Sequence, residues 1–172
     1  MEPTIEIRDA TADDEAALWR LLNYAGGDPD EMQSADEIRA DPALARYVIG
    51  WGRYADAGAI AVDDGTPVGA AWFRLFPADE PGYGFVANDV PELAIFLEPP
   101  ARGRGVGRAL MHRLSEMAHD AGFAMLSLSV RQNNRAALHL YLDLGYEPVD
   151  PGATTTSVTL TAATYPSAPP GN

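Results

Sequence analysis

A short apolar run that leads into an arginine-rich glycine turn and then into a long helical pattern constrains this fold most strongly. The run spans residues 93–97 (LAIFL), and five consecutive apolar residues are typical of a strand that is buried on both faces. The turn spans residues 102–107 and has the sequence RGRGVG. Apolar residues then recur at spacings of four, four, three and four up to Gly122, which predicts an amphipathic helix; they are Val106, Leu110, Leu114, Met117 and Ala121. A buried strand, a turn and a helix in this order predict a sheet covered by helices.

The turn itself has the chemistry of an anion-binding site. The first backbone N–H groups of a helix have no carbonyl partner and lie at the positive end of the helix dipole. Glycines permit positive φ angles and let a ligand come close to the backbone. We therefore expect the turn to bind a pyrophosphate, with charge-assisted hydrogen bonds from Arg102, Arg104 and Arg108.

Three phosphate-binding motifs compete for this turn, and only one of them fits. A Walker A motif requires a lysine, and all 12 basic residues of the chain are arginine. The dinucleotide fingerprint G-x-G-x-x-G fails because Arg108 occupies the position of its last glycine. The pattern R-x-x-G-x-G is complete, with Arg102, Gly105 and Gly107 at its fixed positions.

The remainder of the chain predicts an α/β domain with one mixed sheet, in the order β-α-α-β-β-β-α-β-α-β-β. We expect a single domain over residues 1–165 and a disordered tail over residues 166–172. Residues 46–54 have no clear pattern. The expected strands are 4–8, 58–62, 66–76, 93–97, 124–130, 146–149 and 154–160; the expected helices run from a cap at Thr11 to Leu22, over 30–40, over 106–121 and over 134–144.

A second motif lies one strand beyond the turn. Asn134, Ala137, Tyr141, Gly145 and Tyr146 match the pattern N-x-x-A-x-x-x-Y-x-x-x-G-[FY]. With both motifs in order, the chain resembles the GNAT superfamily, the GCN5-related N-acetyltransferases, over about residues 5–160. The resemblance implies the acyl-CoA N-acyltransferase fold, in which two parallel strands splay apart and the pantetheine arm of acetyl-CoA inserts between them. The splayed strands would be those at 93–97 and 124–130.

The resemblance also implies which residues bind acetyl-CoA, the expected cosubstrate. Backbone groups of Ile95 and Leu97 would bond the pantetheine arm, the glycine-arginine turn would hold the pyrophosphate, and Asn134 would contact the arm as well as cap its helix. The full expected set is Ile95, Phe96, Leu97, Arg102, Gly103, Arg104, Gly105, Val106, Gly107, Arg108, Asn134, Ala137 and Tyr141.

Acyl transfer from a thioester to an amine requires a base and benefits from an acid. An amine with a pKa near 10 is mostly ammonium at pH 7, and a thiolate leaving group needs a proton. By the resemblance, Tyr141 is the candidate acid, with core packing as its other role. Glu92 is the candidate base, although a solvent-exposed carboxylate at a strand end is an equal alternative and ordered water serves many members of the family.

Composition excludes several other classes of function. The absence of cysteine excludes disulfides, thiol nucleophiles and cysteine-ligated metals, and the absence of lysine excludes Schiff-base chemistry. A net charge of −13 argues against nucleic-acid binding. No leader peptide or membrane span is evident, so we expect a cytoplasmic protein. No metal site is expected, because His112 and His119 are two helical turns apart and His139 belongs to another helix.

Charge and aromatic residues give the remaining indications about the acceptor. Residues 9–41 carry ten acidic and two basic residues, whereas residues 102–135 carry six arginines and two acids. A small cationic amine steered to the acidic part is one hypothesis, and general solubility explains the charge equally well. The alternatives are a protein amine acceptor and a non-catalytic acyl-CoA-binding module. The cleft could be lined by aromatics, which could also be core residues (Trp19, Tyr24, Trp72, Tyr83 and Phe85), and residues 83–85 could form a lid. A homodimer is left open.

Overall fold

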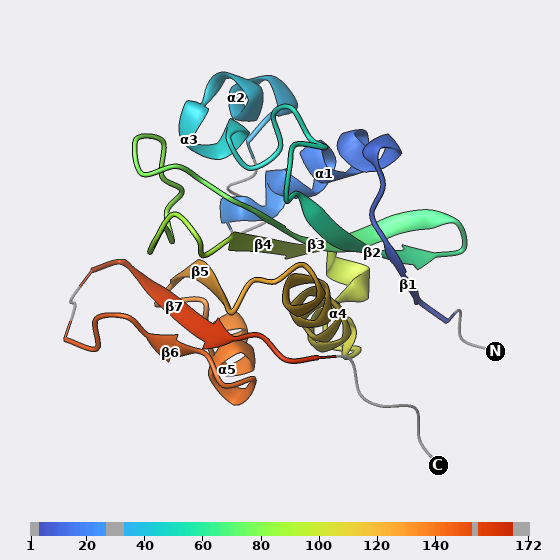
Figure 1. The fold of residues 1–172 in the computed structure, drawn as a ribbon. Coiled ribbons are helices and arrows are strands. Elements are labelled where there is room, and N and C mark those ends of the chain that lie inside the picture. Colours follow the sequence, from blue (N-terminus) through green and yellow to red (C-terminus); the bar gives the residue numbers. More distant parts are fainter. Residues whose placement is uncertain (1–3, 27–32, 153–154, 167–172) are drawn as a thin grey trace, which may run out of the picture.

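The computed structural model describes residues 4–26, 33–152 and 155–166, and it shows one seven-stranded sheet with helices on both faces (Figure 1). The strand order is β1-β2-β3-β4-β5-β7-β6. All neighbouring strands are antiparallel except β4 and β5. The strands are β1 (Glu6–Asp9), β2 (Ala57–Asp63), β3 (Thr66–Arg74), β4 (Glu92–Leu97), β5 (Met125–Arg131), β6 (Glu147–Pro148) and β7 (Ser157–Ala163). The predicted mixed sheet is therefore confirmed.

The helices divide into two layers, one on each face of the sheet (Figure 1). One layer contains α1 (Glu15–Leu22), α2 (Ala35–Ala40) and α3 (Pro42–Ala45), and the other contains α4 (Val106–Asp120) and α5 (Arg135–Asp143). Each layer has its own apolar core. Leu18, Leu21 and Leu22 of α1 pack with Trp72 of β3, whereas Leu110 and Leu114 of α4 belong to the core on the opposite face.

Local sequence signals account for most of the element boundaries. Thr11 caps the 3-10 turn Ala12–Asp14, which leads into α1, through hydrogen bonds typical of a capping box. Gly65 has a φ of 79° in the hairpin between β2 and β3, as the Asp-Asp-Gly sequence predicts. Helix α4 ends at a cap, Ala121, and the next residue, Gly122, has a φ of 90°.

The parallel pair β4 and β5 makes contact at one point of the ladder. Glu92 faces Ser127 there, and the Ser127 N–H donates to the Pro91 carbonyl at 3.0 Å. Beyond this point β4 pairs only with β3, and β5 pairs only with β7. The two strands therefore separate toward the end of β4 that leads to the glycine-arginine turn, as the resemblance implied.

Several predicted boundaries were wrong. The helix expected over residues 30–40 begins at Ala35, where Ser34 caps it, and Asp41 caps a separate short helix, α3. Strand β3 stops at Arg74, two residues early, because Arg74 pairs with Glu92, the first residue of β4, and the ladder with β2 ends one residue before it. The last strand is Ser157–Ala163, three residues later than expected. Of the expected tail, residues 167–172 lie outside the described residues.

Candidate active site

The glycine-arginine turn brings backbone N–H groups together at the start of α4. Gly103 and Gly105 have φ values of 71° and 76°, and a side chain built on either would meet no atom within 4 Å. The first intrahelical bond runs from Ala109 N–H to the Gly105 carbonyl. In the described part of the chain, the N–H groups of residues 106–108 find no carbonyl acceptor. The turn thus combines an open surface, left-handed backbone and unpaired donors, which is the arrangement that binds phosphate.

Gly107 has a different function in the same turn. A Cβ at this position would lie 3.4 Å from Leu140 Cδ2 of α5 and 3.6 Å from Leu97 Cδ1 of β4. Both are ordinary van der Waals distances, so this position packs between a helix and a strand and does not face open space as Gly103 and Gly105 do. Arg108, the next residue, forms an exposed ion pair with Asp143 of α5 at 2.5 Å.

The backbone of β4 presents alternate residues to the gap beside β5. Glu98 N–H donates to the Val68 carbonyl of β3, whereas the Pro91 carbonyl accepts from Ser127 N–H of β5. Since backbone groups alternate along a strand, those of Ile95 and Leu97 point toward the gap. The Leu97 carbonyl accepts from Arg102 Nε at 3.1 Å, so this arginine already folds back over the end of the strand. The side chain of Phe96 lies on the face of α1, 5.8 Å from the Trp72 ring.

The second motif lies on α5, on the opposite face of the sheet from α1. Asn134 caps this helix as predicted, because its Oδ1 accepts from Ala137 N–H at 3.3 Å. Tyr141 is buried, and its ring is 6.1 Å from that of Tyr146. Burial raises the pKa of Tyr141 well above its usual value, so the hydroxyl keeps its proton.

Glu92 is not the solvent-exposed carboxylate that one alternative predicted, because only 2% of its surface is exposed. Its Oε2 accepts from the Tyr47 hydroxyl, and its Oε1 accepts from Gly84 N–H at 2.9 Å. Burial raises the pKa of Glu92 to about 7, although the hydrogen bonds from Tyr47 and Gly84 and the charge of Arg46 act in the opposite direction. A carboxyl group with a pKa near neutrality is suited to exchange protons at physiological pH.

Tyr141 and Glu92 belong to opposite faces of the sheet: Tyr141 lies in the core under α4 and α5, whereas Glu92 shares the face of Ala94 and Phe96. Glu92 shares its face with the neighbouring Ser127, which is fully buried and whose Oγ has no hydrogen-bond partner among the described residues. Fully buried hydroxyls without a partner are rare and cost about 1–3 kcal/mol. Ser127 Oγ is therefore a buried hydroxyl next to Glu92 with unused hydrogen-bonding capacity.

The loop between β3 and β4 covers this place. Gly82 and Gly84 leave no room for side chains: a Cβ on Gly82 would lie 2.4 Å from Glu92 Oε1, and one on Gly84 would lie 2.6 Å from the backbone of Leu128. Tyr83, between them, is 61% exposed and its ring stacks on that of Tyr47. Of the aromatic residues considered for the cleft, Trp19 and Trp72 are core residues, while Tyr24 lies beside Arg102.

Sequence reasoning missed the residues that hold this arrangement together, namely Tyr47, Asp56 and Arg74. Tyr47 lies in the segment without a clear pattern. Arg74 is fully buried at the end of an otherwise apolar strand and pairs with the equally buried Asp56 at 2.8 Å. One signal was available: Arg74 interrupts the apolar run over residues 70–76 (AAWFRLF), and a charged residue inside such a run is rarely buried without a partner.

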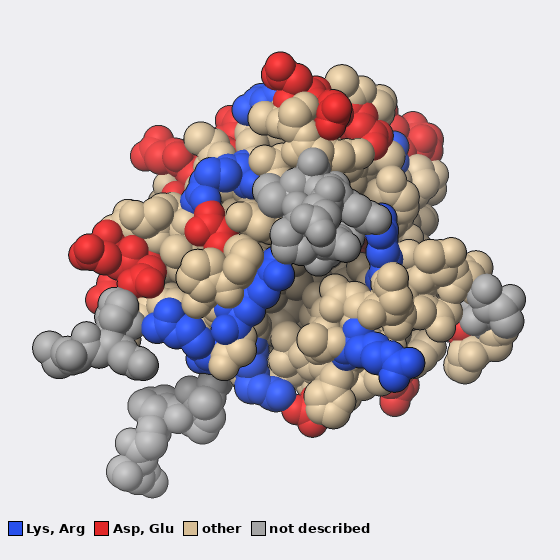
Figure 2. Space-filling view, turned by 180° about the vertical axis from the view of Figure 1, so that it is seen from behind, with Lys and Arg blue, Asp and Glu red and all other residues tan. Residues whose placement is uncertain are grey.

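One face of the molecule carries basic side chains across its middle and acidic side chains at its upper and left edges (Figure 2). Within the described ranges, no three histidine, aspartate or glutamate side chains are grouped as metal ligands. In the same ranges, no helix combines the length and the hydropathy that crossing a bilayer requires.

Comparison with known proteins places these features in one family. Residues 16–146 match the Acetyltransferase (GNAT) family. Mycothiol acetyltransferase of Rhodococcus jostii is 35% identical over 89 residues, which are 51% of this chain and 27% of that protein. Streptothricin acetyltransferase of Streptomyces lavendulae is 29% identical over 120 residues, which are 64% of this chain and 60% of that protein. The chain thus spans less than two thirds of either relative.

Solved structures share the fold at lower identity. The structure of yncA from Salmonella typhimurium, described as a putative acetyltransferase with its cofactor acetyl-CoA, has a TM-score of 0.65 and 21% identity, covering 98% of each chain. Together with the family match over most of the chain, this resemblance confirms the predicted fold. The chain belongs to the GNAT acetyltransferase family.

Proposed function

We propose that the protein is an N-acetyltransferase that uses acetyl-CoA to acetylate a primary amine of a small cationic molecule. The observation that carries this proposal is the single β4–β5 contact at Glu92 and Ser127, from which the strands diverge toward the unpaired amides of α4. This gap joins an anion-binding turn at one end to a buried carboxylate at the other. A linear ligand with a diphosphate and a reactive end fits such a gap.

The residues of the turn and of β4 would hold acetyl-CoA. The amides of residues 106–108, with Gly103 and Gly105, would bind the pyrophosphate, and Arg102 and Arg104 would add charge-assisted donors. The backbone groups of Ile95 and Leu97 would pair with the pantetheine arm, and Arg102 would have to release the Leu97 carbonyl for this. The bound molecule supplies an acetyl thioester, which an uncharged amine can attack.

Glu92 and Tyr141 would move the protons. Glu92 takes a proton from the ammonium form of the acceptor, so that the nitrogen lone pair can form the new C–N bond. Tyr141 would give its proton to the sulfur as the C–S bond breaks, and the second proton that the acceptor nitrogen loses would restore the Tyr141 hydroxyl; burial raises the pKa of Tyr141, so the hydroxyl is protonated before the step. Ser127 Oγ, which lacks a partner among the described residues, would bind the amine beside Glu92.

A cationic acceptor is supported by the acidic side chains near the proposed acceptor end. Helix α2 carries Asp36 and Glu37 in its first turn, above the face of the sheet to which Glu92 belongs. An opposite charge on a small amine would be attracted to this side, whereas CoA would be attracted to the arginines. The names of two relatives, mycothiol acetyltransferase and streptothricin acetyltransferase, are consistent with a small-molecule acceptor.

A panel of amines tests the proposal, with release of free thiol from acetyl-CoA as the readout. Small cationic amines should be turned over, and peptides with free N-termini should not. Tyr141→Phe should lower turnover about 100-fold with little change in acetyl-CoA affinity, because a general acid is typically worth roughly 10²–10⁴ in rate. Tight binding of acetyl-CoA without thiol release for any amine would instead indicate a non-catalytic binding module.

A further inference from the structure

Both oxygens of the Glu92 carboxylate are held by groups from distant parts of the chain. The Tyr47 hydroxyl donates to Oε2, and Gly84 N–H donates to Oε1 at 2.9 Å. The same Tyr47 hydroxyl accepts from Tyr83 N–H at 2.9 Å. The Tyr47 hydroxyl therefore forms hydrogen bonds both with the proposed base and with the loop that covers it.

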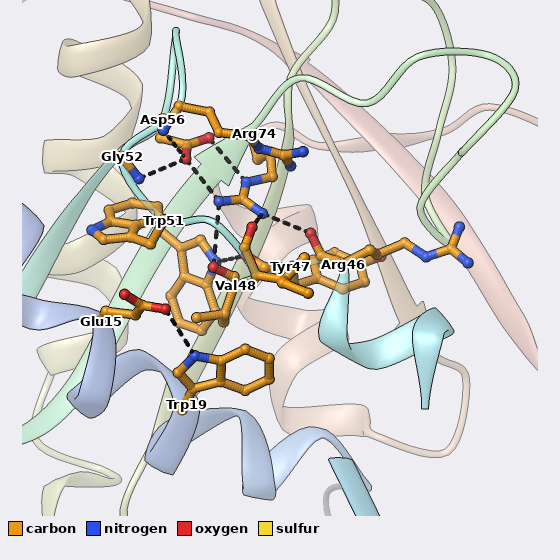
Figure 3. Close-up of polar contacts among 12 residues, drawn as sticks. Glu15, Trp19, Arg46, Tyr47, Val48, Trp51, Gly52, Asp56 and Arg74 are labelled. Atoms are coloured by element: carbon orange, nitrogen blue, oxygen red, sulfur yellow. Dashed lines mark hydrogen bonds and ion pairs between the residues drawn. The ribbon is translucent and has the colours of Figure 1, made fainter. Parts of the chain in front are cut away.

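Tyr47 lies in an irregular segment, yet its backbone is fixed to β3. Trp72 Nε1 donates to the Tyr47 carbonyl at 2.9 Å. Arg74 Nη1 donates to the carbonyls of Arg46 and Ile49 at 2.9 and 2.7 Å, so the residues on both sides of Tyr47 are held as well (Figure 3). This segment therefore has little freedom to move its tyrosine.

Arg74 is itself fixed by a second buried residue. Its Nε and Nη2 bind the two carboxylate oxygens of Asp56 at 3.0 and 2.8 Å, and both side chains are 1% exposed (Figure 3). Asp56 also accepts from the N–H groups of Gly52 and Arg53. The bidentate pair joins both ends of the segment that carries Tyr47, and it neutralises the charge of Arg74 opposite Glu92 in the sheet.

We infer that Tyr47 is a positioning residue for the transfer reaction: its hydroxyl orients the Glu92 carboxylate and stabilises the ionised form that accepts the proton of the acceptor. The inference rests on the proposed function for its catalytic part. The hydrogen bond from Tyr47 requires a protonated hydroxyl, and burial together with the Glu92 charge raises the pKa of Tyr47 far above its ordinary value. Tyr47 thus remains a donor whenever Glu92 is charged.

The other charged and titratable groups around Glu92 come from three elements. Arg46, beside Tyr47, lowers the pKa of Glu92 through its charge, and its side chain also donates to the Pro81 carbonyl of the covering loop. Arg74 on β3 is paired with Asp56. Tyr83 on the loop is exposed, and β5 contributes only the uncharged Ser127. Tyr47 is therefore the side chain that hydrogen-bonds Glu92 directly.

Tyr47→Phe tests the inference, because it removes one hydroxyl and keeps the ring that packs against Phe76. The matched control is Tyr54→Phe, the same change on the same segment at a side chain that is 92% exposed. The titration of the Glu92 carboxyl would be followed by ¹³C NMR, assigned with Glu92→Gln. The acid limb of kcat/KM would be followed in the same proteins with an amine identified from the panel.

The pH midpoint of the Glu92 carboxyl titration should move upward by about one pH unit in Tyr47→Phe, because a hydrogen bond to the charged carboxylate is lost. The acid limb of kcat/KM should move by the same amount, and Tyr54→Phe should leave both midpoints in place. An unchanged carboxyl midpoint in Tyr47→Phe would overturn the inference even if the enzyme is active. A shifted carboxyl midpoint with an unmoved rate profile would also overturn it, because Glu92 would then not be the base. The NMR titration needs no turnover, so it separates this inference from failure of the proposed function.

Discussion

The two ends of β4 present different kinds of binding chemistry. At the C-terminal end, one contiguous turn offers backbone amides, and Gly103 and Gly105 face open space. At the N-terminal end, Glu92 is buried and held by Tyr47 and by the loop at Gly84. The first arrangement depends on local backbone conformation and suits a cosubstrate shared by a family. The second depends on distant segments, which can change between relatives to suit different acceptors.

The largest expected effect is at the turn. Gly105→Asp places a side chain at a φ of 76° and a negative charge beside the proposed pyrophosphate site. Acetyl-CoA affinity should fall roughly 100-fold or more, from like-charge repulsion and lost backbone geometry. Isothermal titration calorimetry measures this. Gly122→Asp is the matched control, since Gly122 has a φ of 90°, faces open space and follows the other end of α4. Equal loss of affinity in both variants would mean that the turn has no special function.

The next effect concerns the stability of the acceptor end. Asp56→Asn leaves the buried charge of Arg74 without its partner, so the free energy of unfolding should fall by about 3–5 kcal/mol. Asp143→Asn breaks the exposed pair with Arg108 at the cofactor end and should cost at most about 1 kcal/mol. Urea unfolding compares the two variants. Similar losses would contradict the contrast between a buried and an exposed ion pair.

The pH dependence of stability gives a third test. The pKa of Glu92 is about 7 in the folded protein and 4.5 ordinarily, so the folded state binds more protons than the unfolded state between these values. Glu92 therefore stabilises the fold fully below pH 4.5, and this stabilisation is lost as the pH rises through 7. Between pH 5 and pH 8, the wild type should lose about 2–3 kcal/mol more than Glu92→Gln. If the wild type and Glu92→Gln lose the same free energy of unfolding between pH 5 and pH 8, measured with urea, the pKa of Glu92 is not raised by folding.

The smallest effect is expected at Arg108. This arginine lies next to the turn but is exposed and already paired with Asp143. Its removal in Arg108→Ala should weaken acetyl-CoA binding by no more than about fivefold, the range of a screened surface charge. Calorimetry at low and high salt checks this value. A loss of acetyl-CoA affinity as large as that in Gly105→Asp would show that the Arg108 side chain, and not the backbone amides, makes the main binding interaction.

The sequence predicted the structure at the C-terminal end of β4 far better than the structure at its N-terminal end. Positive φ at Gly105, the cap at Asn134 and the buried strand are consequences of local sequence, and the structure confirms them. The burial of Glu92 could not be predicted, because it depends on a loop and on the segment that carries Tyr47, 45 residues away. The start of α2 was wrong for a simpler reason: Ser34 and Glu37 form a capping box, which fixes the first turn at Ala35.

We expect the amides at the start of α4 to bind the diphosphate of acetyl-CoA, and amide NMR observes these groups themselves. Titration of ¹⁵N-labelled protein with CoA should shift the N–H signals of Gly103, Gly105 and Gly107, and should leave that of Gly122 unchanged. Saturation of these shifts together would support the assignment. Signals that stay in place at the three glycines while CoA binds elsewhere, or does not bind, would contradict it.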